Sequence, residues 1–267
     1  MSNIRVGYSG LIALAVSMIS ILTSLIFIMI LTRSLSAEDF GTWGIILSLI
    51  TYGLILEPTI SFWTTREIAR GVDAGKTSLI SSMLISILAV LVYLIASYFV
   101  GNSANVNQEI LFIGIILMPI IFVKNSLFAL VIGWKPHLSS YSLLLVEITK
   151  VVFVLIFVHF LEMAIFGIIV AIAIANLGSI LFLVYVGRKK IQVKFQFKIL
   201  KKWLRNSWYT LYTTGGSSLV TLDVLVFVLI SDSTYLLAFY ITGLTVSKIA
   251  GNASAVASAT YSKLLSG

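Results

Sequence analysis

The stretch VGYSGLIALAVSMISILTSLIFIMILT, residues 6–32, runs without a single charged side chain. About 20 helical residues cross the ~30 Å hydrocarbon core of a bilayer, so this stretch is long enough to span it. Backbone amides in lipid must find their hydrogen bonds within their own segment, which requires a helix. The sequence therefore predicts an all-α membrane protein.

Seven more apolar stretches fill most of the chain, separated by short polar breaks. With 59% hydrophobic and 10% charged residues and a mean hydropathy of +1.08, the chain differs sharply from soluble domains, about 25% of whose residues are charged. We predict a polytopic bundle of about eight transmembrane helices. The expected spans are Ser9–Thr32, Gly41–Thr65, Thr77–Val100, Glu109–Gly133, Ser140–Phe160, a sixth that ends at Gly187, Ser207–Ile230 and Tyr235–Ser258.

The net charge of +8 predicts the orientation of this bundle. Basic residues gather in cytoplasmic loops of membrane proteins. Alternate breaks hold Arg66, Arg70 and Lys76, then Lys135, then eight basic residues within 188–206, whereas the other breaks hold only one, Arg33. We therefore predict an N-in, C-in protein of the cytoplasmic membrane. In a soluble protein a net charge of +8 would suggest a nucleic-acid partner. Here the positive charge of cytoplasmic loops explains it, so we expect no such partner.

The basic break at 188–206 is amphipathic as well. Phe197, Leu200 and Leu204 recur at helical spacing among lysines and Arg205. Such a helix can lie in the headgroup layer with its cations on anionic lipid, or it can be a linker that obeys the charge rule. The two interpretations are compatible.

The sequence offers few residues that are suited to catalysis or metal binding. The chain has no cysteine, and its two histidines, His137 and His159, are far apart in sequence. Without thiols there is neither a disulfide nor a cysteine-ligated metal. The sequence has no paired-acid motif and no histidine cluster near an interface, so we expect neither an enzyme nor a metal or other cofactor.

Six charged residues fall inside the predicted spans: Glu57, Lys124, Glu147, Lys150, Asp223 and Lys248. A charge at the bilayer centre costs at least ~2.5–3.5 kcal/mol on insertion scales, so each needs a partner, a wet cavity or a role. Glu147 and Lys150 are three residues apart and share a helix face. They form either a mutually neutralising structural pair or a pair that faces a cavity.

The other four allow similar alternatives. Lys124 either snorkels or pairs with another helix, or it lies in a cationic lumen; Lys248 is deeper, which favours a cavity. Asp223 is a candidate for proton or sodium coupling, and equally for a structural partner of Lys248. Glu57 precedes Pro58, which removes a helix hydrogen bond and kinks the helix, either as a hinge or for packing.

Three segments resemble a known family. RSL at 33–35 with DFG at 39–41, TREIAR at 65–70, and KWLRNS at 202–207 followed by Asp223 are similar to polysaccharide-biosynthesis flippases of the Wzx type. These belong to the multidrug/oligosaccharidyl-lipid/polysaccharide exporter (MOP) superfamily.

The resemblance implies a fold of two six-helix lobes. It also implies movement of a polyprenyl-pyrophosphate-linked oligosaccharide across the membrane by alternating access. Against that pattern, this chain would hold a six-helix lobe at 1–187, a basic linker at 188–206, and the first two helices of a second lobe at 207–267. We therefore expect a truncated gene product or a fragment.

The resemblance also gives the intramembrane charges roles. Cations in a lumen would bind anionic substrate, and carboxylates would exchange a coupling ion, H⁺ or Na⁺. The expected partners are the lipid-linked oligosaccharide, membrane lipids, and a polysaccharide polymerase with glycosyltransferases. The alternatives are a cation-coupled drug exporter of the same superfamily, or a non-transporting fragment. The predicted binding residues are Lys124, Lys150 and Lys248, with Arg33, Arg66 and Arg70 at the two mouths, although these three arginines also fit ordinary interface anchors. The predicted coupling residues are Asp223, Glu147 and Glu57.

Overall fold

The computed structural model describes residues 6–104, 106–219, 223–231 and 235–244, and within these ranges the chain forms helices and no β-strand. Six helical stretches are long and apolar enough to cross a membrane, which confirms the predicted polytopic all-α membrane protein. The elements are α1 (Val6–Ser34), α2 (Ala37–Gly53), η1 (Leu54–Leu56), α3 (Pro58–Ala69), α4 (Gly75–Ala104), α5 (Gln108–Ile113), η2 (Gly114–Ile116), α6 (Leu117–Trp134), α7 (Pro136–Val154), η3 (Leu155–Phe160), α8 (Ala164–Ile191), α9 (Phe197–Asn206), α10 (Trp208–Leu219), α11 (Asp223–Ser231) and a helix over Tyr235–Leu244.

Local sequence signals set several helix boundaries. The side chain of Ser36 accepts a hydrogen bond from the backbone N–H of Asp39 and so caps α2, with the acidic residues of the first turn favoured by the helix dipole. The break predicted at Glu57-Pro58 is present. There α2 tightens into the 3₁₀ turn η1, and α3 begins at Pro58, whose missing N–H is tolerated in a first helical turn.

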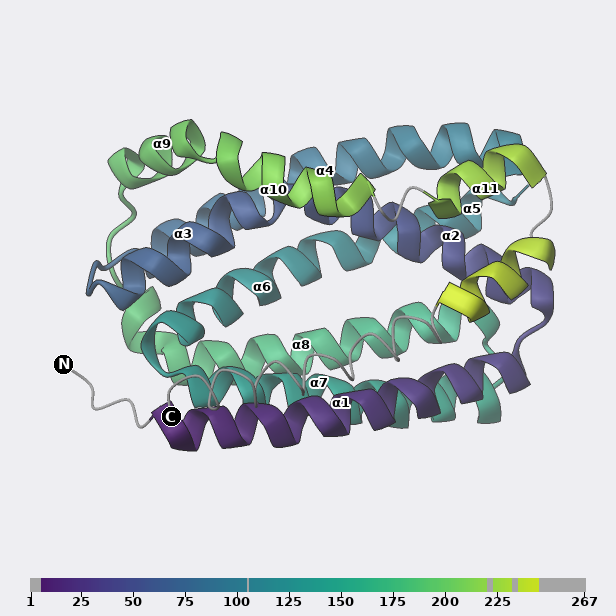
Figure 1. Ribbon diagram of the computed structural model, residues 1–267, viewed down its shortest axis with the longest axis horizontal. Helices are drawn as coiled ribbons and strands as arrows, with labels where there is room; N and C mark the ends of the chain where they lie inside the picture. The colour runs from purple at the N-terminus through teal and green to yellow at the C-terminus, as the bar shows by residue number, and fades with distance from the viewer. Residues whose placement is uncertain (1–5, 105, 220–222, 232–234, 245–267) are drawn as a thin grey trace, which may run out of the picture.

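The long helices lie side by side along the long axis of the molecule (Figure 1). They pack in two groups, one in which α7 contacts both α1 and α8, and one in which α6 contacts both α3 and α4; the contact of α6 with α8 joins the groups. Small hydroxyl side chains at these contacts let helix backbones approach closely. Ser78 of α4 forms hydrogen bonds with Thr64 of α3 and Ser126 of α6, and Ser142 of α7 with Ser179 of α8.

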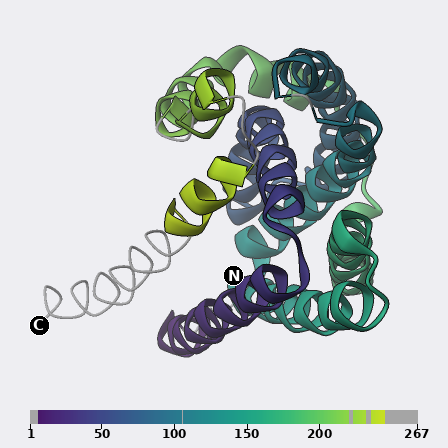
Figure 2. The ribbon, with the colours of Figure 1, turned by 90° about the vertical axis from the view of Figure 1, so that its right-hand side faces the viewer.

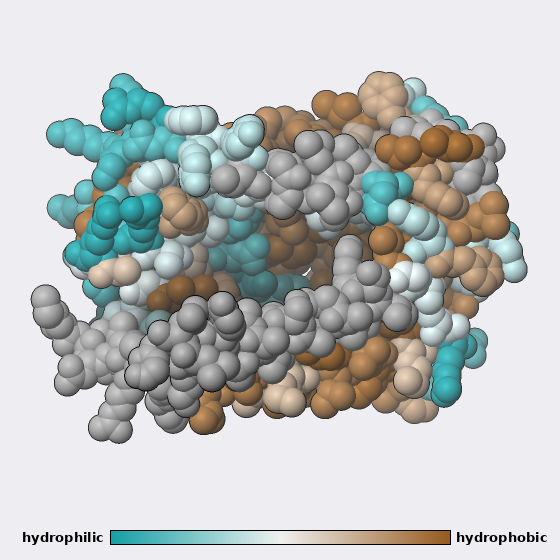
Figure 3. Space-filling view, viewed as in Figure 1, coloured by the Kyte–Doolittle hydropathy of each residue, from teal (hydrophilic) through white to brown (hydrophobic). Residues whose placement is uncertain are grey.

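The apolar surface of the molecule fits a lipid environment. Only 11% of the most apolar window of α1 is buried, against 56% for α2, so α1 lies at the periphery and α2 in the core. Figure 3 shows hydrophobic atoms over the middle of the molecule and hydrophilic atoms gathered at the end that carries α9. The hollow at the centre of the same face has hydrophilic atoms on its floor (Figure 3).

The basic break that was predicted to be amphipathic forms the helix α9. Leu200 and Trp203 are buried against α3 and α4, whereas Phe197 and Leu204 of the same helix are exposed. One side of α9 therefore packs on the other helices, and Phe197 and Leu204 leave apolar surface outside this contact.

The predicted seventh span is described as α10 up to Leu219 and α11 from Asp223, and residues 220–222 between them lie outside the described residues. Asp223 lies in the first turn of α11, where its Oδ1 accepts from the backbone N–H of Val224. The last predicted span is described only over Tyr235–Leu244, which lies beyond α11 in the open side of the helix arrangement (Figure 2).

Candidate functional site

Four ionisable side chains from three segments lie close together inside the helix bundle formed by α1–α8. Glu57 comes from the break between η1 and α3, Lys124 from α6, and Glu147 and Lys150 from α7. Lys124 interacts electrostatically with each of the other three. The sequence singled out each of these residues separately, and the fold brings them together.

The ion pair expected from the spacing of Glu147 and Lys150 is present. Lys150 Nζ lies 2.8 Å from Glu147 Oε2, and the two side chains are 17% and 13% exposed, respectively. The same Oε2 accepts from the hydroxyl of Thr23, at 3.0 Å, and Lys150 Nζ lies 5.1 Å from the centre of the Phe27 ring. Both of these partners belong to α1. The pair is therefore charge-balanced locally, and it ties α7 to α1.

Lys124 has a different environment. Its Nζ lies 5.8 Å from the centre of the Phe128 ring on the same helix, and in the part of the chain that the structure describes no carboxylate comes within 4 Å of it. The Glu57 carboxylate, whose Oε2 accepts from Ser61 at 3.0 Å, interacts with it only through space. Lys124 thus remains a half-buried cation able to bind a further anion.

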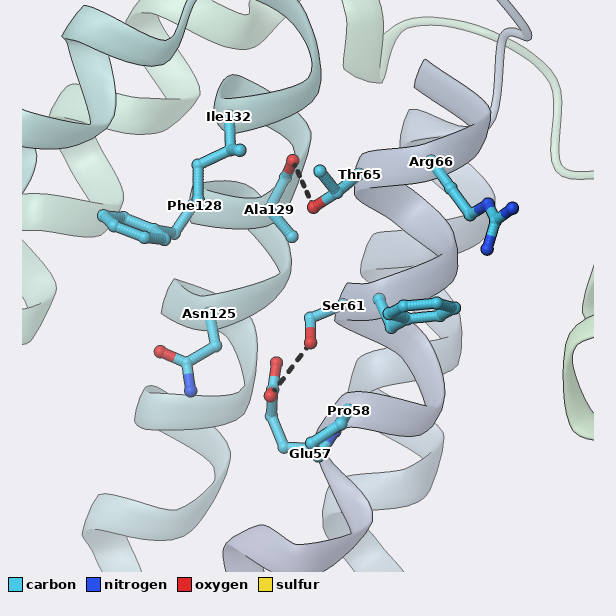
Figure 4. A pocket seen from close by; sticks show the side chains of 10 residues that line it. Glu57, Pro58, Ser61, Thr65, Arg66, Asn125, Phe128, Ala129 and Ile132 are labelled. Atoms are coloured by element: carbon cyan, nitrogen blue, oxygen red, sulfur yellow. Dashed lines mark hydrogen bonds between the residues drawn. The ribbon is translucent and has the colours of Figure 1, made fainter. Parts of the chain in front are cut away.

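A pocket with a volume of about 610 Å³ opens between α3 and α6, and we term it the α3/α6 pocket. Its lining is mainly apolar, with a few polar groups that include the Glu57 carboxylate and the Asn125 amide (Figure 4). Such a composition is typical of sites for small molecules. The lining residues are Glu57, Pro58, Ser61, Phe62, Thr65, Arg66, Asn125, Phe128, Ala129 and Ile132.

Close contacts between the two helices fix the shape of this pocket. The side-chain hydroxyl of Thr65 in α3 donates a hydrogen bond to the backbone carbonyl of Ala129 in α6 at 3.1 Å (Figure 4). One turn further, Gly133 lies so close to α3 that an added Cβ would meet the Thr65 carbonyl oxygen. The absence of a side chain at Gly133 therefore permits the close approach of α3 and α6 at one end of the pocket.

The remaining predicted site residues are dispersed. Arg66 lines the α3/α6 pocket, with its guanidinium 5.7 Å from the Phe62 ring. Arg33, in the last turn of α1, and Arg70, at the end of α3, are exposed and do not line this pocket. Asp223 Oδ2 accepts from the Tyr240 hydroxyl at 2.7 Å, and Lys248 lies outside the described residues.

Sequence reasoning missed two groups of residues. The partners of the ion pair on α1, Thr23 and Phe27, carry no signal, because their role depends on which face of α1 meets α7. Ser61 and Asn125 of the pocket were missed as well. An asparagine beside an intramembrane lysine is a signal that could have been used, since buried amides need hydrogen-bond partners.

Comparison with known protein families gives a match to this sequence. The family model described as "Polysaccharide biosynthesis protein" matches residues 7–259. The chain belongs to the polysaccharide biosynthesis protein family. The expectation from the three resembling segments is thus confirmed at the level of the family. No curated protein matches the sequence.

Solved transporter structures share the fold of this family member. A MATE protein in complex with MaD5 matches with a TM-score of 0.64 at 16% identity, over 97% of this chain and 65% of that one. A MOP superfamily transporter from Pyrococcus furiosus matches with a TM-score of 0.61 at 19% identity, over 95% of this chain and 63% of that one. An inward-facing multidrug resistance MATE family transporter matches with a TM-score of 0.65 at 17% identity, over 95% of this chain and 66% of that one. The chain therefore spans about two thirds or less of the length of these transporters.

Proposed function

We propose that the chain acts, alone or with the rest of a second lobe, as a flippase that moves a polyprenyl-pyrophosphate-linked oligosaccharide across the cytoplasmic membrane. The family match supports a role in polysaccharide biosynthesis, and the shared fold supports transport by alternating access. In this proposal the protein binds and moves its substrate without catalysing a reaction. Glycosyltransferases that build the lipid-linked oligosaccharide and a polymerase that uses it after transport are its proposed partners.

The observation that carries the proposal is the environment of Lys124. A lysine inside a membrane lobe costs free energy, and such cost is tolerated where the charge is paired or lines a hydrated cavity. Lys150 has a carboxylate partner at 2.8 Å, whereas Lys124 lies beside a pocket, and the nearest carboxylates among the described residues are more than 4 Å from it. A pyrophosphate would form charge-assisted hydrogen bonds with this ammonium group.

The carboxylates near these lysines supply candidates for ion coupling. In the proposed transporter, Glu57 and Glu147 are the residues that bind H⁺ or Na⁺ when the substrate is absent. Asp223, held by the Tyr240 hydroxyl, is a third candidate. Exchange of the ion for the anionic substrate would couple the two movements.

The test replaces lysines in a strain that depends on this gene for its surface glycan. We expect Lys124→Gln to reduce the glycan at the surface with unchanged amounts of the protein in the membrane, and Lys150→Gln and Lys248→Gln to do so as well. Lys189→Gln, which makes the same change at an exposed position in the last turn of α8, is the control. Full surface glycan with Lys124, Lys150 and Lys248 all replaced by glutamine would overturn the proposal.

A further inference from the structure

The α3/α6 pocket combines two kinds of surface that bind sugars. We propose that it binds the sugar attached to the diphosphate, as a neutral monosaccharide, while Lys124 binds the diphosphate itself. This inference rests on the proposed function and assigns the two parts of the substrate headgroup to different residues. It makes Asn125, Ser61 and Glu57 determinants of sugar specificity.

The polar groups of the pocket match the hydroxyls of a sugar. The Asn125 amide both donates and accepts, and among the described residues it has no hydrogen-bond partner. A carboxylate has about four acceptor positions, of which Ser61 occupies one at Glu57. In Figure 4, Asn125 of α6 lies level with Glu57 and Ser61 on the other side of the space between the helices. Neighbouring hydroxyls of one sugar ring can therefore donate to Glu57 while another exchanges hydrogen bonds with Asn125.

The rest of the lining suits the apolar faces of a sugar ring. Phe62 and Phe128 provide aromatic surface, and Pro58 and Ile132 provide aliphatic surface. Ring C–H groups pack on such surfaces, while the hydroxyls at the ring edge find the few polar groups. The volume of about 610 Å³ leaves room for one sugar and part of its neighbour.

The charges around the pocket favour a neutral ligand over an organic cation. A carboxylate among aromatic rings would by itself attract a cation. Here Lys124 interacts electrostatically with Glu57. The negative charge is therefore opposed by a positive one, which repels a cationic ligand and leaves hydrogen bonding as the main role of the carboxylate.

The position of Lys124 places the diphosphate next to this sugar. The Phe128 ring lines the pocket and at the same time lies 5.8 Å from Lys124 Nζ. The pocket and the cation are thus separated by one aromatic side chain. In a lipid-linked saccharide the first sugar is bonded directly to the diphosphate, so both sites can be occupied by one headgroup.

Binding of two probes by the purified chain in detergent tests the assignment. The probes are farnesyl diphosphate and the same molecule carrying one N-acetylglucosamine, measured by titration calorimetry. We expect the wild type to bind the glycosylated probe about fivefold to tenfold more tightly, the effect of one or two hydrogen bonds. Asn125→Leu and, independently, Ser61→Ala should reduce this ratio and leave the affinity for farnesyl diphosphate unchanged. Lys124→Gln should weaken the binding of both probes.

Asn102→Leu provides the control, because it makes the same chemical change at an exposed residue near the end of α4. Equal affinity of the wild type for both probes, with both weakened by Lys124→Gln, would overturn the sugar site and leave the proposed function standing. Failure of the wild type to bind either probe would overturn both. Binding of tetraphenylphosphonium that is lost in Glu57→Gln would show a cation site in place of a sugar site.

Discussion

Lys202 of α9 and Glu67 of α3 form an ion pair of 2.9 Å whose two ends differ in exposure. The carboxylate side chain is 8% exposed, whereas the lysine side chain is 51% exposed. Beside this pair, Trp203 of α9 is fully buried against α3 and α4. The helix α9 therefore packs on α3 and α4, and one of its lysines forms an ion pair with a carboxylate that is almost out of contact with solvent.

Removing Lys202, the exposed member of this pair, should lower the stability of the protein. In Lys202→Met the Glu67 carboxylate stays buried without its cation, so we expect the free energy of unfolding to fall by about 1–3 kcal/mol. Glu67→Gln should cost less, because the amide oxygen still accepts from Lys202. Thermal unfolding of the purified protein in detergent measures both. Lys201→Met, at an exposed residue of the same helix, should change stability by less than about 1 kcal/mol. Equal effects of Lys202→Met and Lys201→Met would contradict the role of the pair.

The Glu147–Lys150 pair should show strong coupling between its members. Glu147→Gln or Lys150→Met alone leaves one charge without its counter-charge in the membrane lobe, and we expect each to cost about 1–3 kcal/mol. The double variant removes both charges and should be more stable than Lys150→Met alone. A double-mutant cycle of thermal unfolding in detergent gives the coupling energy. Additive losses would mean that the two charges stabilise the lobe independently.

Gly133→Ala should separate α3 from α6. An added Cβ would meet the Thr65 carbonyl oxygen and the side chain of Ile68, and a backbone atom cannot turn aside. We expect a loss of about 1–3 kcal/mol, as for overpacked cores, and weaker ligand binding in the adjoining pocket. Gly243→Ala is the matched control, since a Cβ there would meet nothing within 4 Å. Wild-type stability and binding in Gly133→Ala would show that the helices can adjust without cost.

The predicted orientation can be tested because the sequence has no cysteine. A single cysteine at Lys198, an exposed residue of α9, should react with a membrane-impermeant maleimide only after the cells are opened. A single cysteine at Asn102, near the end of α4 and followed by a break predicted to be outside, should react in intact cells. The reverse pattern would mean that α9 faces the outside.

Several features of the fold follow from residues that are close in sequence. The apolar stretch at 6–32 predicts α1, and Pro58 predicts the break before α3. The spacing of Glu147 and Lys150 predicts their ion pair, because residues three apart in a helix lie on one face. The resembling segments around Arg33, Arg66 and Trp203 indicated the family. The intramembrane charges were identified as candidates in the same way, one by one.

The α3/α6 pocket and the partner of Glu67 depend on how the helices rotate and cross. In a soluble helix the apolar stripe shows which face packs inward. A membrane helix such as α1 or α4 is apolar on all sides, since lipid tails are as apolar as leucine, so its pattern does not reveal the packed face. The sequence by itself thus determined the six long apolar segments that can span the membrane, with their approximate positions. Only the tertiary structure decided that Asn125 faces the same pocket as Glu57 and that Trp203 is buried while Phe197 is exposed, because these contacts depend on close packing between helices.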